Sequence, residues 1–237
     1  PVCSGVVDRY KAERASALPL VTCVTDITSH SEWIHPGTDC YLVGSGELRR
    51  RLADKGVDPG RILVTGIPVK EEFKRISRHP KNGERHLLIM GGGLGLLPKK
   101  ERFYQQLNSL PGVKTVLIAG RNQKMVEWLD GRYENIQVVG LTSQVHEYMA
   151  WADLVLTKAG GITLFETIYA ELPLLAWQPF LEQERRNTRF LVERELGRVA
   201  GREPEQCLQD IKDLIYDTHS LGRMAANMRG VKAMLEQ

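Results

Sequence analysis

Short apolar runs recur along the 237-residue chain, and segments with helical spacing separate most of them. The runs are apolar throughout rather than alternating, which is typical of strands in a parallel sheet covered on both faces. The predicted strands are Leu20–Thr25, Cys40–Val43, Arg61–Thr65, His86–Met90, Thr115–Ala119, Ile136–Val139, Leu154–Thr157 and Leu174–Ala176. The predicted helices include Glu47–Lys55, Lys99–Leu110, Val145–Trp151 and Thr163–Glu171. This alternation predicts an α/β fold with doubly wound parallel sheets.

A polar stretch at residues 77–84, "SRHPKNGE", predicts a linker between two domains. Residues 1–76 contain three predicted strands and resemble the C-terminal part of a Rossmann-like domain, so we expect this first domain to be incomplete. Residues 85–215 contain the pattern of a complete domain. Residues 216–237 carry apolar side chains at helical spacing and predict an amphipathic terminal helix. The chain starts at Pro1 rather than Met, which suggests a fragment or a processed chain.

Composition excludes several classes of protein. The chain is 42% hydrophobic and 26% charged, values typical of a soluble globular protein. Its formal net charge of +3 is small and dispersed, so we expect no nucleic-acid partner. No apolar run approaches the roughly 20 residues that a membrane-spanning helix needs. The four cysteines and six histidines are scattered without ligand spacing, which predicts no metal site.

Two glycine-rich turns each follow a predicted strand and precede a helical segment. The first is in "IMGGGLGLLP", residues 89–98, and the second is in "TKAGGITLFE", residues 157–166. A helix that begins at such a turn exposes unpaired backbone N–H groups and the positive end of its dipole, which favours anions. Two such turns in one domain predict an anionic ligand that is bound from both sides.

A dinucleotide is the first alternative ligand. However, the spacing Gly91-x-Gly93-x-Gly95 lacks the third glycine of the dinucleotide fingerprint. The following strand also ends in Gly120-Arg121-Asn122 rather than in the acidic residue that binds a ribose. Arg121 suits the additional phosphate of NADP, so a nicotinamide cofactor stays open as an alternative.

The polar side chains near the second turn allow both a structural and a ligand-binding interpretation. Thr163-x-x-Glu166 matches a capping box, in which Thr caps the helix and Glu reaches back to the backbone of Thr. Alternatively, Glu166 contacts a ligand. In "QPFLEQERRN", Gln183 and Asn187 are four residues apart and share a helix face. That face either contacts the ligand or is a solvated charged surface.

Five segments occur in one order and at one spacing that identify a family: "VTDITSHSEWIHPGTDCYLV", "ILVTGIPVKEEF", "MGGGLG", "TKAGGITLFE" and "QERRN". Together they resemble the processive diacylglycerol glucosyltransferases and the plant-type monogalactosyldiacylglycerol synthases. More distantly, the chain is similar to the peptidoglycan enzyme that adds N-acetylglucosamine to a lipid-linked intermediate. The resemblance covers nearly the whole chain. It implies the GT-B architecture, in which two Rossmann-like domains occur and the second holds most of a UDP-sugar.

The resemblance also implies roles for individual residues. Glu166 would bind the ribose hydroxyls of UDP, the glycine turns would face the diphosphate, and Thr142 would lie where the backbone reads the uracil edge. The implied nucleotide-binding residues are Gly92, Gly93, Gly95, Arg121, Thr142, Gly160, Gly161, Ile162, Thr163 and Glu166. The implied sugar-binding residues are Gln183, Glu184 and Asn187, and Lys70 stands where relatives often carry an Arg near the interdomain cleft. Ala159 and Leu181-Glu182 depart from the family pattern, which leaves the sugar preference open.

The implied reaction is transfer of a hexose from a UDP-sugar to a lipid hydroxyl such as that of diacylglycerol, with inversion and without a cofactor. No Asp-x-Asp motif occurs, and helix N-termini can stabilise the leaving diphosphate, so we expect no metal requirement. The general base of the family belongs to an early part of the first domain. Asp26 and His30, in "TDITSH", are the local candidates for this base, and a structural role for both is the alternative.

The resemblance implies a cytoplasmic enzyme that contacts the inner face of the cell membrane peripherally. Arg49, Arg50 and Arg51 would attract anionic lipid headgroups, unless they form only a solvated helix face. Two other functions stay open at this point. One is a UDP-sugar epimerase of the same fold, and the other is a nucleotide-binding fragment without turnover.

Overall fold

The computed structural model describes residues 2–27, 29–77, 83–93, 95, 97–179 and 181–235. The chain forms two compact units, one that extends to Val69 and one that begins at Lys70. The boundary therefore differs from the sequence-based boundary, which placed residues 70–76 in the first unit. The physical reason is helix α3 (Glu71–Lys74), which packs on helix α7 of the second unit. Phe73 is buried there, and its ring meets His146 edge-on with centroids 6.0 Å apart.

The first unit is built on a three-stranded parallel sheet in the order β1-β2-β3. Its elements are α1 (Val2–Arg14), β1 (Val21–Cys23), β2 (Cys40–Val43), α2 (Gly46–Ala53) and β3 (Ile62–Val64), with 3-10 turns at Ser31–Trp33 and Pro59–Arg61. Side chains from β2, β3 and α2 form its core, in which Tyr41, Leu48, Leu52 and Ile62 are almost fully buried. Three strands in this unit agree with the sequence pattern.

The second unit is built on a six-stranded parallel sheet in the order β6-β5-β4-β7-β8-β9. Its strands are β4 (Arg85–Met90), β5 (Val113–Gly120), β6 (Ile136–Gly140), β7 (Leu154–Thr157), β8 (Leu174–Ala176) and β9 (Gly197–Val199). Numbered within the unit, this order is 3-2-1-4-5-6, the doubly wound order of dinucleotide-binding domains. The chain direction across the sheet reverses between β4 and β7, and the gap that this reversal opens is where such folds bind ligands.

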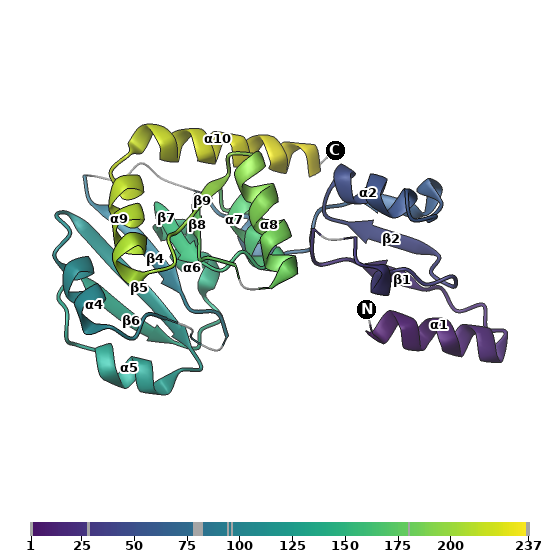
Figure 1. Cartoon of the computed structure of the whole chain (residues 1–237), viewed down its shortest axis with the longest axis horizontal. Coiled ribbons are helices and arrows are strands. Elements are labelled where there is room, and N and C mark those ends of the chain that lie inside the picture. The colour runs from purple at the N-terminus through teal and green to yellow at the C-terminus, as the bar shows by residue number, and fades with distance from the viewer. Residues whose placement is uncertain are drawn as a thin grey trace. The chain divides into compact units, whose positions relative to one another are not determined.

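Helices flank this sheet on both faces (Figure 1). They are α4 (Glu101–Asn108), α5 (Gln123–Leu129), α6 (Val145–Trp151), α7 (Gly161–Tyr169), α8 (Glu182–Glu193), α9 (Pro204–Ile215) and α10 (Thr218–Leu235). Right-handed crossovers place α4 and α5 on one face and α7 and α8 on the other. One large apolar cluster joins the strands to α4, α5 and α9. Its strand residues, such as Leu87, Ile89 and Leu117, alternate along the strands and therefore lie on one face of the sheet. The residues between them, such as Leu88, Val116 and Val155, are also buried, so the sheet is covered on both faces, as the sequence indicated.

All eight strands expected from the sequence are present, and the fold class is confirmed as α/β with parallel sheets. Sequence analysis missed β9, whose three residues begin with a glycine. Gly197 is required there because a Cβ atom would lie 1.9 Å from the carbonyl oxygen of Leu174. The terminal helix is present as α10, and its apolar positions Leu221, Met224, Met228 and Val231 are buried, as predicted.

Candidate functional site

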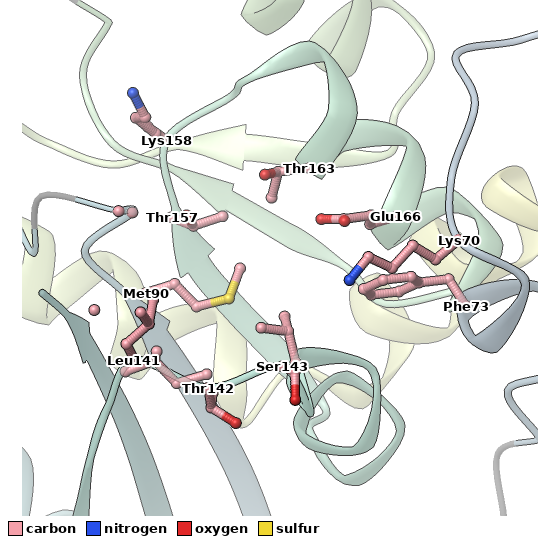
Figure 2. A pocket seen from close by; sticks show the side chains of 15 residues that line it. Lys70, Phe73, Met90, Leu141, Thr142, Ser143, Thr157, Lys158, Thr163 and Glu166 are labelled. Atoms are coloured by element: carbon pink, nitrogen blue, oxygen red, sulfur yellow. The ribbon is translucent and has the colours of Figure 1, made fainter.

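A pocket of about 240 Å³ opens in the second unit at the reversal point between β4 and β7 (Figure 2). Residues from the turn after β4, the turn after β7, the loop after β6 and helix α3 line it. Its volume is close to the lower end of the ~300–1,000 Å³ range of small-molecule sites. The carboxyl ends of parallel strands and the start of helix α7 therefore converge on one cavity.

The turn after β4 depends on glycine at particular positions. Gly92 and Gly95 have φ angles of +67° and +61°, which side chains strongly disfavour. A Cβ atom on Gly95 would lie 2.1 Å from the carbonyl oxygen of Ala119, and the Asn122 amide donates to the carbonyl of Gly95 at 3.0 Å. Gly92 and Gly93 line the pocket. Gly95 instead packs behind the turn, so the structure gives it a supporting role.

The turn after β7 leads directly into α7, which begins at Gly161 with Gly160 as its N-cap. Among the described residues, no side chain caps this helix. Thr163 is its third residue, so the predicted capping box is wrong: the two glycines let the helix begin before Thr163. The first-turn N–H groups of residues 161–163 have no acceptor within the helix. Gly161 and Ile162 carry no polar side-chain atoms, so only their backbone N–H groups could bind an anion here.

Glu166 lies one turn further along α7, and its carboxylate faces the pocket (Figure 2). Burial raises the pKa of this carboxyl group, and the positive charge of Lys70 lowers it in part. With the residues that the structure describes, the Glu166 carboxylate forms neither a hydrogen bond nor an ion pair. A partly desolvated carboxylate without a bonded partner is a hydrogen-bond acceptor available to a ligand. Thr163 and Lys70 line the same space.

The helix α8 residues differ from the sequence expectation. Gln183 is exposed, whereas Asn187 is fully buried and its Nδ2 donates to the carbonyl oxygen of Ala159 at 2.9 Å. Glu184 is buried, and its Oε1 lies 3.5 Å from Nζ of Lys158. Gln183 and Asn187 therefore do not share an exposed helix face. Because Glu184 and Asn187 are buried, the interpretation of this segment as a solvated charged surface is wrong for these two residues. Asn187 supports the turn before α7 through this bond.

The remaining predicted residues lie in different places. Thr142 lines the pocket, and its hydroxyl accepts a hydrogen bond from the Gln144 N–H at 3.0 Å. Arg121 is exposed, and its backbone N–H donates to the carbonyl of Gly93 at 3.3 Å. Arg121 is not among the described residues that line the pocket.

Asp26 and His30, the candidate general bases, belong to the first unit. Asp26 is half-buried and His30 is exposed. Nδ1 of His30 accepts a hydrogen bond from the Glu32 N–H at 3.3 Å and caps the 3-10 turn Ser31–Trp33. This contact gives His30 a structural role, and a catalytic role for either residue stays a prediction.

Sequence analysis missed several residues that line the pocket, namely Phe73, Met90, Leu141, Ser143 and Lys158. Apolar residues at helix and strand ends are normally assigned to the core, so Phe73, Met90 and Leu141 carried no functional signal. Lys158 lies just before Ala159 and the second glycine turn, and this position is the signal that could have identified it.

Two classes of feature are absent from the described part of the chain. Its residues contain no group of three His, Cys, Asp or Glu side chains placed to hold a metal ion. Nor, within those ranges, does any helix combine the length and apolar content that a bilayer crossing requires.

The sheet order defines a Rossmann-like domain, and two glycine turns and the acidic side chain of Glu166 line the pocket at its reversal point. Residues 86–229 match the family model "Glycosyltransferase family 28 C-terminal domain", and residues 2–69 match that of monogalactosyldiacylglycerol (MGDG) synthase. The chain belongs to glycosyltransferase family 28.

Curated relatives with similar sequences include two that are named processive diacylglycerol beta-glucosyltransferase. Those from Bacillus licheniformis and Bacillus subtilis are each 27% identical over 238 residues, which cover 95% and 94% of this chain. The same alignments cover 62% of each relative, so the chain spans less than two thirds of their length.

Solved structures confirm the fold as GT-B. MurG from Acinetobacter baumannii superimposes with a TM-score of 0.66 at 17% identity, covering 95% of this chain and 68% of that one. The Staphylococcus aureus MnaA–UDP co-structure gives a TM-score of 0.65 at 15% identity, covering 92% of this chain and 64% of that one. Anabaena Alr3699/HepE, solved with UDP and glucose, gives a TM-score of 0.57 at 14% identity, covering 99% of this chain and 73% of that one.

Proposed function

We propose that this chain holds the donor site of a hexosyltransferase that moves a hexose from a UDP-sugar to a lipid hydroxyl such as that of diacylglycerol. The observation that carries the proposal is the Glu166 carboxylate, which faces the pocket between two glycine turns without a bonded partner among the described residues. A ribose offers two vicinal hydroxyl donors to such an acceptor. Membership of family 28 and the names of the curated relatives support the same function.

The pocket residues would divide the donor between them. The first turn of α7 and the backbone of Gly92 and Gly93 would bind the diphosphate, and Glu166 would bind the ribose. Charge grows on the diphosphate as the glycosidic bond breaks, and preorganised N–H groups stabilise that charge in the transition state. The acceptor hydroxyl would attack the anomeric carbon from the opposite side with inversion. Asp26 or His30 would accept the hydroxyl proton.

The first expected result is selective binding and acceptor-dependent turnover. UDP and UDP-hexoses should bind the purified chain in isothermal titration calorimetry, and NADPH should produce no heat of binding. In the full-length protein that contains this chain, free UDP should accumulate only when a diacylglycerol acceptor is added. Accumulation of an epimeric UDP-sugar without an acceptor would instead identify an epimerase. NADPH binding without UDP binding would overturn the assignment.

A second expected result concerns metal ions. Because backbone N–H groups rather than carboxylates are proposed to contact the diphosphate, UDP affinity should change little when EDTA is added. Titrations of UDP in EDTA and in Mg²⁺ or Mn²⁺ measure this directly. A strict requirement for either metal would exclude the metal-free account.

A third expected result concerns membrane contact at the cytoplasmic face, which we propose is peripheral and electrostatic. Arg49 and Arg50 are exposed on α2, and Arg51 pairs with Glu47. Each exposed basic residue near an anionic surface contributes about 1 kcal/mol. Changing all three to Glu should therefore reduce flotation with anionic liposomes strongly at low salt. The matched control changes Lys99, Lys124 and Arg132 of the second unit to Glu, and equal loss in both triple variants would contradict the proposal.

A further inference from the structure

Lys158 lies between the two glycine turns and has an acidic partner. Its Cε atom lies 3.4 Å from the position that a Cβ on Gly92 would occupy, so this part of the side chain lies beside the first turn. Its Nζ lies 3.5 Å from Oε1 of Glu184. The Lys158 side chain is 53% exposed, whereas that of Glu184 is 11% exposed. The ammonium group is therefore accessible to solvent, whereas most of the glutamate side chain is buried.

The other charged side chains of the pocket determine which anions the Lys158 ammonium group can contact. Among the described residues that line the pocket, Lys70 and Lys158 are the two bases and Glu166 is the acid. Lys70 acts electrostatically on Glu166, which leaves Lys158 as the cation beside the turn formed by Gly92 and Gly93. A diphosphate that binds at this turn adds negative charge within reach of Lys158. The ammonium group then has two competing anionic partners.

We propose that Lys158 changes partners when the donor binds, from the Glu184 carboxylate in the unliganded protein to the diphosphate in the complex. This inference rests on the proposed function and adds a coupling between two parts of the donor. When Lys158 leaves, the buried Glu184 carboxylate loses the charge of that ammonium group, and additional hydrogen-bond donors would offset this loss. Hydroxyl groups of the hexose supply such donors. Glu184 thus restrains UDP binding alone and favours UDP that carries a sugar.

This exchange has a signature that a purely structural ion pair lacks. If Glu184 competes with the diphosphate for Lys158, removing the charge of Glu184 should tighten UDP binding. The gain should require Lys158, so the two substitutions should be non-additive. Glu184→Gln keeps the shape of the side chain and one acceptor oxygen while removing the charge, and Lys158→Met keeps the length of the stem. Lys158→Arg keeps the positive charge.

The experiment is a double-mutant cycle measured by calorimetry with UDP, uridine and UDP-glucose. A matched control cycle uses Lys100→Met and Glu205→Gln, since Lys100 and Glu205 form an exposed ion pair at 3.2 Å next to α4 and on α9. Melting temperatures check that each variant is folded. If Lys158→Met fails to fold, Lys158→Gln takes its place, and Glu184→Gln in the parent background still tests the competition.

We expect Lys158→Met to weaken UDP binding roughly tenfold, since charge-assisted contacts with phosphate are strong. Uridine, which has no phosphate, should bind as before, and Lys158→Arg should restore most of the UDP affinity. Glu184→Gln should tighten UDP binding about threefold or more when Lys158 is present and leave it unchanged in the Lys158→Met background. The same substitution should reduce the additional affinity that UDP-glucose has over UDP.

Three outcomes would overturn this inference. These are an unchanged UDP affinity in Lys158→Met, a weaker UDP affinity in Glu184→Gln, and the same effect of Glu184→Gln in both backgrounds. Each of them leaves the proposed function intact as long as the parent chain binds UDP. A parent chain that binds no UDP would overturn the proposed function itself.

Discussion

Replacing Glu166 by Gln should lower the affinity for UDP roughly tenfold or more, because charged hydrogen bonds contribute about 1.5–3 kcal/mol. Gln keeps one acceptor oxygen but loses the charge that strengthens the bonds from two ribose hydroxyls. Calorimetry of the parent and the variant measures the loss. Uracil alone should be unaffected, since it carries no ribose. Equal UDP affinity in both proteins would leave the nucleotide site resting on the glycine turns alone.

The same substitution should not destabilise the fold. Burial raises the pKa of Glu166 in the folded state, so folding takes up a proton and the neutral form is the better accommodated one. The contribution of such a group to the free energy of unfolding is fully present below its pKa in the unfolded chain. That contribution is lost as pH rises through its pKa in the folded protein. At neutral pH the Glu166→Gln variant should therefore melt at the same or a slightly higher temperature than the parent.

This difference in melting temperature should shrink as pH falls below the ordinary pKa of glutamate, because Glu166 then becomes neutral in both states. Thermal melts of the two proteins between about pH 4 and pH 8 test the sign. The matched control is Glu193→Gln, an exposed glutamate on α8, whose effect should be small across the range. A Glu166→Gln variant that is clearly less stable at neutral pH would show that the carboxylate serves the fold.

Gly95→Ala should reduce the free energy of unfolding by about 2–5 kcal/mol. A side chain at the φ of +61° costs roughly 1–2 kcal/mol, and overpacking costs roughly 1–3 kcal/mol more. The overpacking is unavoidable because the new Cβ would lie 2.1 Å from the Ala119 carbonyl oxygen and 2.5 Å from Cβ of Asn122. Neither atom is the flexible end of a side chain. Urea unfolding of the parent and the variant gives the difference.

Gly93→Ala is the control from the same turn. Among the described residues, no atom lies within 4 Å of the Cβ position at Gly93, and its φ is outside the left-handed range. Its stability should therefore stay close to that of the parent, whereas its UDP affinity should fall because the methyl group enters the pocket. Similar destabilisation by both substitutions would mean that the whole turn, rather than the Gly95 contact, limits stability.

Sequence alone determined the order of the elements and the positions of both glycine turns. Uniformly apolar runs such as Leu154–Thr157 and Leu174–Ala176 predicted parallel strands because each run carries its own signal, and both agree with the structure. The ordered motifs also identified the family, since they depend on residue identity and spacing along the chain. These properties are local, or they repeat at fixed intervals, and a linear sequence records them directly.

The tertiary structure decided which residues share the pocket and what each of them does. Lys70, Lys158 and Glu166 are far apart or on different elements, and the pairing of β4 with β7 and the packing of α3 on α7 bring them together. Helix α7 starts at Gly161 after its N-cap Gly160, rather than at the capping sequence of Thr163. Burial separated Asn187 from Gln183 and raised the pKa of Glu166. Desolvation and contact depend on neighbours that come from distant parts of the chain, so no local pattern contains them.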